Sequence, residues 1–315
     1  MTSYDACGLL VGHATDAEGA TGCTVVRGAD GPVRAAVHVV GRATGTRELA
    51  LLDPGQLVDR VDAILLAGGS AYGLDAAAGV MRWMEERARG FPVGSGVVPI
   101  VPAAVVFDLA PLGRFDARPT AAMGHAACEA AVSTPAEGSI GAGTGATVGK
   151  VAGAAHSMKG GCGIGSVDDG SVVVRALAVV NAFGDVRDGS GRIVAGARHA
   201  DGGWLDTAAH VARSAGPATR FDAFTGRNTT LCVVSTNVAL DRVQLASLAR
   251  AASAALFRRI TPVGTPYDGD IVFATSPCID GIAASALQVE AMSVRALELA
   301  IERAVRTRTA GEILP

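Results

Sequence analysis

Hydrophobic positions along the chain fall into short, often β-branched runs and into longer stretches where apolar residues recur every three or four positions. The short runs, bounded by glycine, proline or polar residues, predict strands, and the longer stretches predict helices. The predicted strands are residues 23–26, 35–40, 61–67, 171–183, 229–236 and 270–275, with a proline-interrupted, buried extended stretch at 97–109. The predicted helices are residues 72–89, 120–132, 201–214, 241–257 and 282–305.

The order of these elements indicates the fold class. Strands and helices mix without a strict βαβ alternation, which favours sheets covered by helices over a doubly wound fold. The chain has 41 glycines among its 315 residues, which predicts many tight turns, and residues 138–165 are especially rich in them. No internal repeat, linker or charge block divides the sequence, so we expect a single domain over residues 1–315.

The composition limits the classes of function. Hydrophobic residues make up 49% of the chain and charged residues 18%, which provides for a sizeable core and excludes general disorder. The net charge of −3 without a basic run and the aromatic content of 4% argue against nucleic-acid binding. The expected partner is therefore a small molecule or peptide, unless the role is purely structural.

No targeting or membrane segment is evident. The first ten residues carry Asp5 and no basic residue ahead of an apolar stretch, unlike a secretory signal. The most apolar stretch, residues 97–107, is too short to span a bilayer. The six cysteines form no Cys-x-x-Cys pair, which is typical of reduced thiols. We therefore expect a cytoplasmic protein that does not bind a membrane.

Lysine and asparagine are unusually scarce. Of the 27 basic residues only Lys150 and Lys159 are lysines, and Asn181, Asn228 and Asn237 are the only asparagines. Because the pKa of an amine, unlike that of a guanidinium, can be tuned towards neutral pH, a retained lysine can indicate chemistry. Chance retention explains the same pattern, so the scarcity alone assigns no role.

Familiar cofactor and catalytic motifs are incomplete. The glycine-rich run 141–146 follows a loop instead of a strand, and the residues around Lys150 lack the first glycine and the Ser or Thr of a phosphate-binding loop. Ser70 lies at a strand-to-helix turn, but Tyr72 occupies the position where a nucleophile elbow has glycine. The histidines and cysteines show no zinc spacing, and Cys162, between glycines, fits packing better than catalysis. We expect neither a metal nor another cofactor.

A polar loop at 225–228 runs directly into the strand that opens with Thr229. On its own this is an ordinary start of a strand. If the chain were cut before Thr229, that residue would gain an α-amine with a pKa of about 7.7–8.0 beside its own hydroxyl. Such an amine can act as a general base without a histidine, so Thr229 is a candidate nucleophile.

Three further polar residues fit the same chemistry. Asn181 lies inside the β-branched strand 171–183, where a buried amide needs partners and can donate to an oxyanion. Asp268 and Asp270 are two residues apart at a strand start, so strand geometry would place both carboxylates on one face, where they can orient an ammonium or polarise the nucleophile. The alternatives are a satisfied core amide and a turn with an acidic rim, and spacing alone does not choose between them.

Six segments carry a recognisable signature: GLLVGHATD (8–16), GCTVV (22–26), AGGSAYGLD (67–75), VPIVPAA (98–104), KGGCG (159–163) and NTTL (228–231). In this order they resemble the L-aminopeptidase/D-esterase family of self-processing hydrolases. That family includes β-aminopeptidases and the nylon-oligomer (6-aminohexanoate-oligomer) hydrolases, and the resemblance covers almost the whole chain.

The resemblance implies a four-layer αββα sandwich like that of N-terminal-nucleophile hydrolases and a precursor that cuts itself once. It places the cut between Asn228 and Thr229, giving an α chain of residues 1–228 and a β chain of residues 229–315. It implies an amide hydrolase that acts through an acyl-enzyme on small peptide or amide substrates and assembles as a homo-oligomer, a tetramer of αβ pairs. The implied catalytic residues are Thr229, Lys150, Asn181, Asp268 and Asp270.

Details of the motifs point to one branch. Thr after Asn at the cut, Lys150, and the pair Asp268 and Asp270 look more like the nylon-oligomer hydrolases than the aminopeptidases, which leaves the natural substrate open. Lys159 competes with Lys150 for the site, because the glycine-rich region aligns poorly. Two other functions stay open: an acyltransferase of the ornithine-acetyltransferase type and a non-catalytic, unprocessed homologue.

Overall fold

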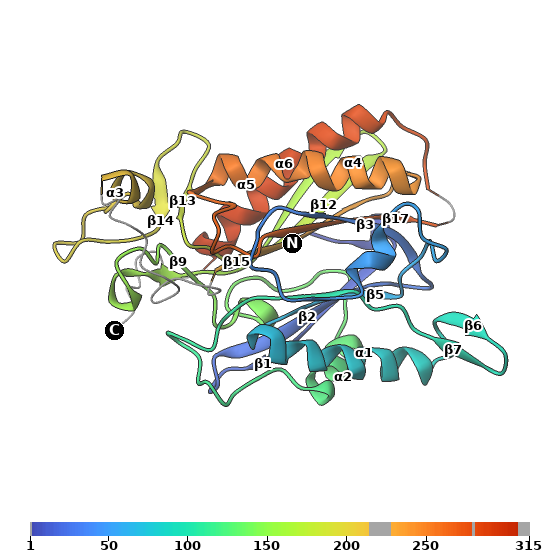
Figure 1. Ribbon diagram of the computed structural model, residues 1–315. Coiled ribbons are helices and arrows are strands. Elements are labelled where there is room, and N and C mark those ends of the chain that lie inside the picture. The colour runs from blue at the N-terminus through green and yellow to red at the C-terminus, as the bar shows by residue number, and fades with distance from the viewer. Residues whose placement is uncertain (1, 214–227, 279–280, 308–315) are drawn as a thin grey trace.

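Two five-stranded sheets form the middle of the computed structural model, which describes residues 2–213, 228–278 and 281–307 (Figure 1). In order across the first sheet are β1 (Leu9–Asp16), β2 (Thr21–Gly28), β5 (Ala63–Ala67), β8 (Ala103–Val105) and β4 (Thr46–Arg47). In order across the second are β11 (Gly161–Asp169), β12 (Val172–Asn181), β15 (Thr229–Thr236), β17 (Ile271–Pro277) and β3 (Val33–Val39). Neighbouring strands are antiparallel except for the parallel pairs β5–β8 and β15–β17.

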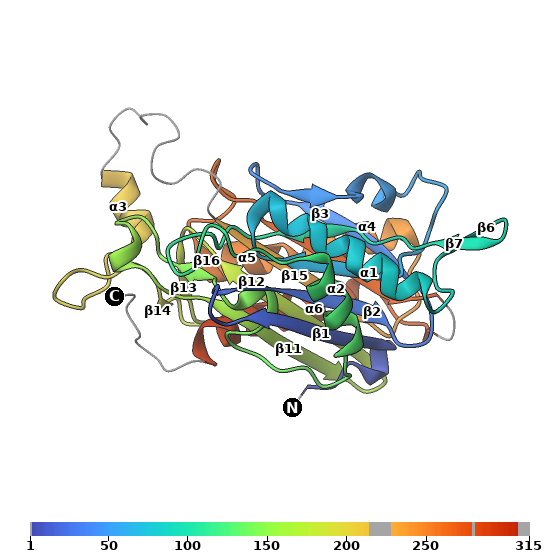
Figure 2. The same cartoon turned by 90° about the horizontal axis from the view of Figure 1, so that it is seen from below.

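Helices cover the outer face of each sheet. The first sheet packs against α1 (Ala76–Glu85), which contacts β5, and α2 (Ala121–Glu129), which lies over β1 and β2 when the molecule is seen from below (Figure 2). The second sheet packs against α4 (Arg242–Ala252), α5 (Ala254–Arg259) and α6 (Ala286–Arg306). The layers follow in the order helix, sheet, sheet, helix, so the predicted αββα sandwich is confirmed (Figure 1). Among the described helices, none is both long and apolar enough to cross a bilayer.

Apolar side chains fill all three interfaces between the layers. Leu66, Leu177 and Phe273 belong to the core between the two sheets, and separate clusters join each sheet to its helices. The second sheet is therefore covered on both faces. A strand buried on both faces needs an almost continuous apolar run instead of an alternating one. This explains the Val- and Ala-rich sequences of β12 and β15.

Glycines in β11 allow α6 to approach the sheet closely. A Cβ at Gly163 would lie 2.2 Å from the Ala300 carbonyl oxygen, and one at Gly165 would lie 1.9 Å from that of Ala296. Directly before Gly163, Cys162 is fully buried in the core between the sheets, and burial raises the pKa of its thiol to about 12. A thiol with such a pKa stays protonated at neutral pH. The packing interpretation of Cys162 fits this geometry.

Three small sheets adjoin the sandwich. The hairpin of β6 (Phe91–Val93) and β7 (Gly96–Val98) projects from the body of the molecule (Figure 2). The strands are β9 (Thr147–Val148) with β10 (Met158–Lys159), β13 (Asp185–Arg187) with β14 (Ile193–Ala195) and β16 (Ile260–Thr261), and β6 with β7.

The predicted strands are present with ends that differ by two residues at most, whereas the helices are shorter than predicted. The helix predicted at 72–89 opens as a 3₁₀ turn (Ser70–Asp75) and is α-helical only over α1. The stretch 97–109 forms strand only at 97–98 and 103–105, on either side of the prolines, which lack a backbone N–H for a ladder. The remaining differences are the division of 241–257 into α4 and α5, the start of α6 at Ala286, and the reduction of 201–214 to α3 (Thr207–Arg213), residue 214 lying outside the described residues.

Candidate active site

Two strand ends in the middle of the second sheet bring the predicted nucleophile and amide together. β12 ends at Asn181 and β15 begins at Thr229, and the antiparallel register pairs these two residues directly. The exposed fractions are only 1% for Asn181 and 3% for Thr229. Because buried polar groups need hydrogen-bond partners, the contacts around this pair define the site.

The segment leading into β17 lies on the other side of Thr229. Asn228 and Asp268 form a parallel bridge, and the Gly269 N–H donates to the Asn228 carbonyl oxygen at 2.9 Å. The next residue of this segment, Asp270, also contacts β15, because its carboxylate accepts the Thr230 N–H at 2.6 Å. The peptide bond before Thr229 is therefore held by this segment, while Thr229 itself pairs with β12.

The hydroxyl of Thr229 lies on that same peptide bond. Its Oγ1 donates to the Asn228 carbonyl oxygen at 2.5 Å. The carbonyl oxygen thus receives two donors, this hydroxyl and the Gly269 N–H. An attack by Oγ1 on the adjacent carbonyl carbon uses up the hydroxyl proton, so the Gly269 N–H is the donor that stays on the oxygen where negative charge would develop.

Lys150 binds the amide of Asn181. Its Nζ donates to Asn181 Oδ1 at 2.8 Å and to the Asn181 backbone oxygen at 3.0 Å. The Thr147 N–H also donates to Oδ1, and Asn181 Nδ2 donates to the Phe107 carbonyl oxygen at 2.9 Å. These contacts fix the orientation of the amide, and they place a positive charge beside it.

The structure separates the two lysines that compete for the site. Lys159 Nζ donates to the backbone oxygens of Gly143, Ala146 and Gly160 at 2.9, 3.0 and 3.3 Å. It therefore binds the glycine-rich loop, whereas Lys150 is the lysine that contacts Asn181.

Asp108, which sequence reasoning missed, anchors the backbone that holds Asn181. It follows Phe107, and its fully buried carboxylate accepts the Gly69 N–H at 2.6 Å and the Thr21 hydroxyl at 2.7 Å. Burial raises the pKa of Asp108 to about 6 despite these donors. The Gly69 N–H, in the turn that precedes Ser70, therefore binds a carboxylate of the chain itself.

Asp268 and Asp270 are buried, with 2% and 0% exposed, which excludes a surface acidic turn. Burial raises the pKa of both carboxyls, and repulsion from Asp268 adds to the effect on Asp270, whose pKa is raised to about 7. The nearby charge of Lys150 acts in the opposite direction and lowers the pKa of Asp268. The pair therefore holds a proton at pH values where exposed carboxyls have lost theirs.

The raised pKa of Asp270 predicts a pH-dependent stability. An unfolded chain loses this proton near pH 4 and the folded chain near pH 7, so the free energy of unfolding should fall as pH rises between them. In a Thr229→Ala background, which is expected to stay uncut, Asp270→Asn should make urea-unfolding free energies fall less steeply from pH 4 to pH 7. Asp116→Asn removes a carboxyl whose side chain is 83% exposed and serves as the control. Equal slopes in the parent and the Asp270→Asn variant would contradict the prediction.

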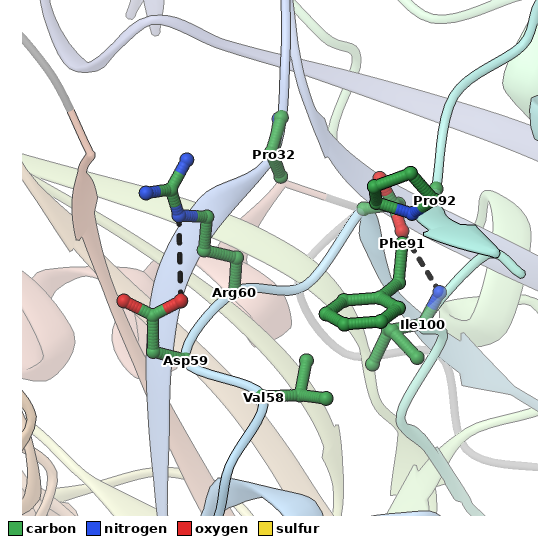
Figure 3. Close-up of a pocket in the computed structure, with 9 residues that line it drawn as sticks. Pro32, Val58, Asp59, Arg60, Phe91, Pro92 and Ile100 are labelled. Atoms are coloured by element: carbon green, nitrogen blue, oxygen red, sulfur yellow. Dashed lines mark hydrogen bonds and ion pairs between the residues drawn. The ribbon is translucent and has the colours of Figure 1, made fainter. Parts of the chain in front are cut away.

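A pocket of about 300 Å³ lies elsewhere on the molecule, between the β6 strand and the chain around Val58 (Figure 3). Its charged groups are engaged locally, because Arg60 pairs with Asp59 and the carboxylate of Asp62 accepts the Ile100 N–H. None of the five predicted catalytic residues lines it. Within the described residues, no group of three or more His, Cys, Asp or Glu side chains could hold a metal ion.

Comparison with known proteins decides the family. The model of peptidase family S58 matches residues 4–309. The chain belongs to peptidase family S58. The family S58 protein is 44% identical to an uncharacterized aminopeptidase of Mycobacterium tuberculosis, over 86% of this chain and 79% of that protein. It is 33% identical to a 6-aminohexanoate-oligomer endohydrolase of Agromyces, over 94% of this chain and 82% of that protein.

Solved structures share the fold of the family S58 protein. The L-aminopeptidase D-Ala-esterase/amidase of Ochrobactrum anthropi, described as a variant of the Ntn hydrolase fold, superposes with a TM-score of 0.70 and 22% identity. The superposition covers 96% of this chain and 86% of that one. A β-aminopeptidase of Burkholderia gives a TM-score of 0.67 at 22% identity, covering 94% and 84%. With its family and relatives, the protein is a hydrolase of peptide bonds.

Proposed function

We propose that the family S58 protein is a self-processing amide hydrolase whose nucleophile is Thr229, freed as the N-terminal residue of a β chain. The observation that supports this most directly is the Thr229 hydroxyl, 2.5 Å from the Asn228 carbonyl oxygen inside a polar cluster that is buried except for the half-buried Lys150. The cluster consists of Lys150, Asn181, Asp268 and Asp270.

In the self-cleavage, Thr229 Oγ1 loses its proton and attacks the carbonyl carbon of Asn228. The C–N bond between the two residues then breaks, and the Thr229 nitrogen takes up a proton to become an amine. The product is an ester between the Asn228 acyl group and Oγ1. Water hydrolyses this ester, which leaves a carboxylate on Asn228 and both a hydroxyl and an amine on Thr229.

In the mature enzyme, the Thr229 amine accepts the hydroxyl proton while Oγ1 attacks the carbonyl of an amide substrate. The substrate's amine leaves with a proton, and water releases the acyl group from Oγ1. Positive charge on Lys150, close to the strand end, lowers the pKa of the Thr229 amine and keeps it a free base near neutral pH. We propose peptides or amides of amino acids as substrates, including oligomers like those named for the Agromyces relative.

The test is the intact mass of the freshly purified protein under denaturing conditions. Scaling the 31.6 kDa mass by residue count, cleavage should give chains of roughly 23 and 9 kDa, the smaller beginning Thr-Thr-Leu-Cys. The cut protein should then release amines from aminoacyl anilides or 6-aminohexanoate oligomers. A single chain that persists on long incubation would refute self-processing. Transfer of the acyl group to added amines, with little hydrolysis, would favour an acyltransferase instead.

A further inference from the structure

We propose that the backbone N–H of Gly269 is the oxyanion donor for self-cleavage, and that the same N–H later binds the carbonyl oxygen of the substrate. The inference rests on the proposed self-processing and assigns a role in it to a main-chain N–H group. Its basis is the 2.9 Å hydrogen bond from Gly269 N to the Asn228 carbonyl oxygen, the atom on which charge would develop.

The peptide that carries this N–H is fixed on both sides. The N–H groups of Arg42 and Ala43 donate to the Asp268 carbonyl oxygen at 2.8 and 2.9 Å. Those of Val40 and Gly41 donate to the Asp270 carbonyl oxygen at 2.9 and 3.0 Å. Four backbone hydrogen bonds from one segment, residues 40–43, therefore hold Gly269 between its neighbours. A donor held in this way needs no reorganisation when charge develops on its acceptor, which is the condition for strong stabilisation.

The carboxylates flanking Gly269 add to the clamp. Asp270 accepts the N–H of Thr230, and Asp268 accepts the N–H of Thr265 at 2.9 Å. Residue 269 is thereby tied to the same strand that begins with Thr229. The two aspartates then have a positioning role for the donor, in addition to their effect on local charge.

The absence of a side chain at residue 269 is required by space. Gly269 is not one of the described glycines with a positive φ, so a residue with a side chain could adopt its backbone conformation. A Cβ there would lie 2.7 Å from Thr229 Oγ1 and 2.7 Å from the Ala43 carbonyl oxygen. Real Cβ atoms essentially never come that close to other heavy atoms, so a side chain would displace the nucleophile or the segment 40–43. Glycine lets the N–H and the hydroxyl reach one carbonyl oxygen together.

The sharpest test removes the N–H and keeps the shape. Cell-free translation with a suppressor tRNA charged with glycolic acid replaces Gly269 N–H by an ester oxygen. The expected result is that the precursor converts to two chains about 100-fold more slowly than the parent, as for loss of one oxyanion donor. The same replacement at Gly124, whose N–H donates to Thr120 in the distant α2 region, is the control and should cleave at the parental rate.

A second pair of variants tests the spatial requirement. Gly269→Ala should block or strongly slow cleavage, whereas Gly281→Ala should not. A Cβ at Gly281 would also meet atoms at 2.7 Å, those of Ala239, beyond the opposite end of β15. The control therefore matches the crowding without touching Thr229, and resistance to limited proteolysis reports folding in every variant.

The outcomes separate the two proposals. An uncut parent would refute self-processing itself. A parent that is cut, together with a folded ester variant at Gly269 that is cut at the parental rate, would overturn the role of the N–H alone. Slow cleavage of both the Gly269 and Gly124 esters would also overturn it, because the loss would then follow from backbone esters in general.

Discussion

Replacing Thr229 with alanine is expected to leave the chain at full length and to reduce amide hydrolysis at least about 10³-fold. Both reactions need the same hydroxyl, and without the first reaction the α-amine that serves the second never forms. Intact mass would show one 31.6 kDa species, and an amine-release assay would show only background hydrolysis.

Two other variants make the interpretation specific. Thr229→Ser keeps the hydroxyl and should still be cut at the same bond. Thr236→Ala removes another buried threonine at the far end of β15, whose hydroxyl donates to the Val173 carbonyl oxygen at 3.0 Å. It should lose some stability and retain both reactions. Cleavage of Thr229→Ala before residue 229 would contradict the proposal, because another group would then have to supply the nucleophile.

The layered fold was predictable because burial shapes the sequences of its strands. β12 and β15 are nearly uninterrupted apolar runs, which is the pattern of strands covered on both faces. β1 shows the limit of this signal. Gly12, His13 and Thr15 break its apolar pattern, so it is absent from the predicted strands although it pairs with β2 along its whole length. The family resemblance, more than periodicity, supplied the four-layer arrangement.

The candidate site was predictable as a list of residue types and not as an arrangement. Scarce Lys and Asn, and two close aspartates, are visible in the sequence, whereas the pairing of Asn181 with Thr229 depends on which strands become neighbours. That choice is set by the whole fold, across a separation of many residues. The choice between Lys150 and Lys159 likewise needed coordinates, because nine residues of a glycine-rich loop can place either amine near the strand end.

Two of the residues that sequence reasoning missed act through their backbones. Gly269 contributes an N–H, and Phe107 contributes the carbonyl that receives the Asn181 amide. Every residue but proline carries a backbone N–H, so the identity of a residue says nothing about its use. The one available signal was glycine itself between two aspartates, which indicates a turn as readily as a close approach.

The second large effect is expected for the substitution of Lys150, and Lys159 provides a matched comparison. Lys150→Met is expected to slow both self-cleavage and amide hydrolysis about 100-fold or more in the folded protein. The substitution removes the charge that binds Asn181 Oδ1 and favours the free base of the Thr229 amine. Lys150→Arg should not restore the rate, since a planar guanidinium cannot replace a compact ammonium that binds Oδ1 and the backbone oxygen of one residue.

Lys159→Met should lower the stability of the protein and largely keep both rates. Its ammonium binds the backbone oxygens of Gly143, Ala146 and Gly160, so its loss leaves partly buried carbonyls without their charged donor. The expected cost is about 1–3 kcal/mol of stability, with rates within about tenfold of the parent in the folded protein. Urea unfolding and the rate of precursor conversion, measured on both variants, separate the two effects. If Lys159→Met instead abolished cleavage at unchanged stability while Lys150→Met remained active, the chemical role would pass to Lys159. The hydrogen bond between Lys150 and Asn181 would then serve only to hold the end of β12.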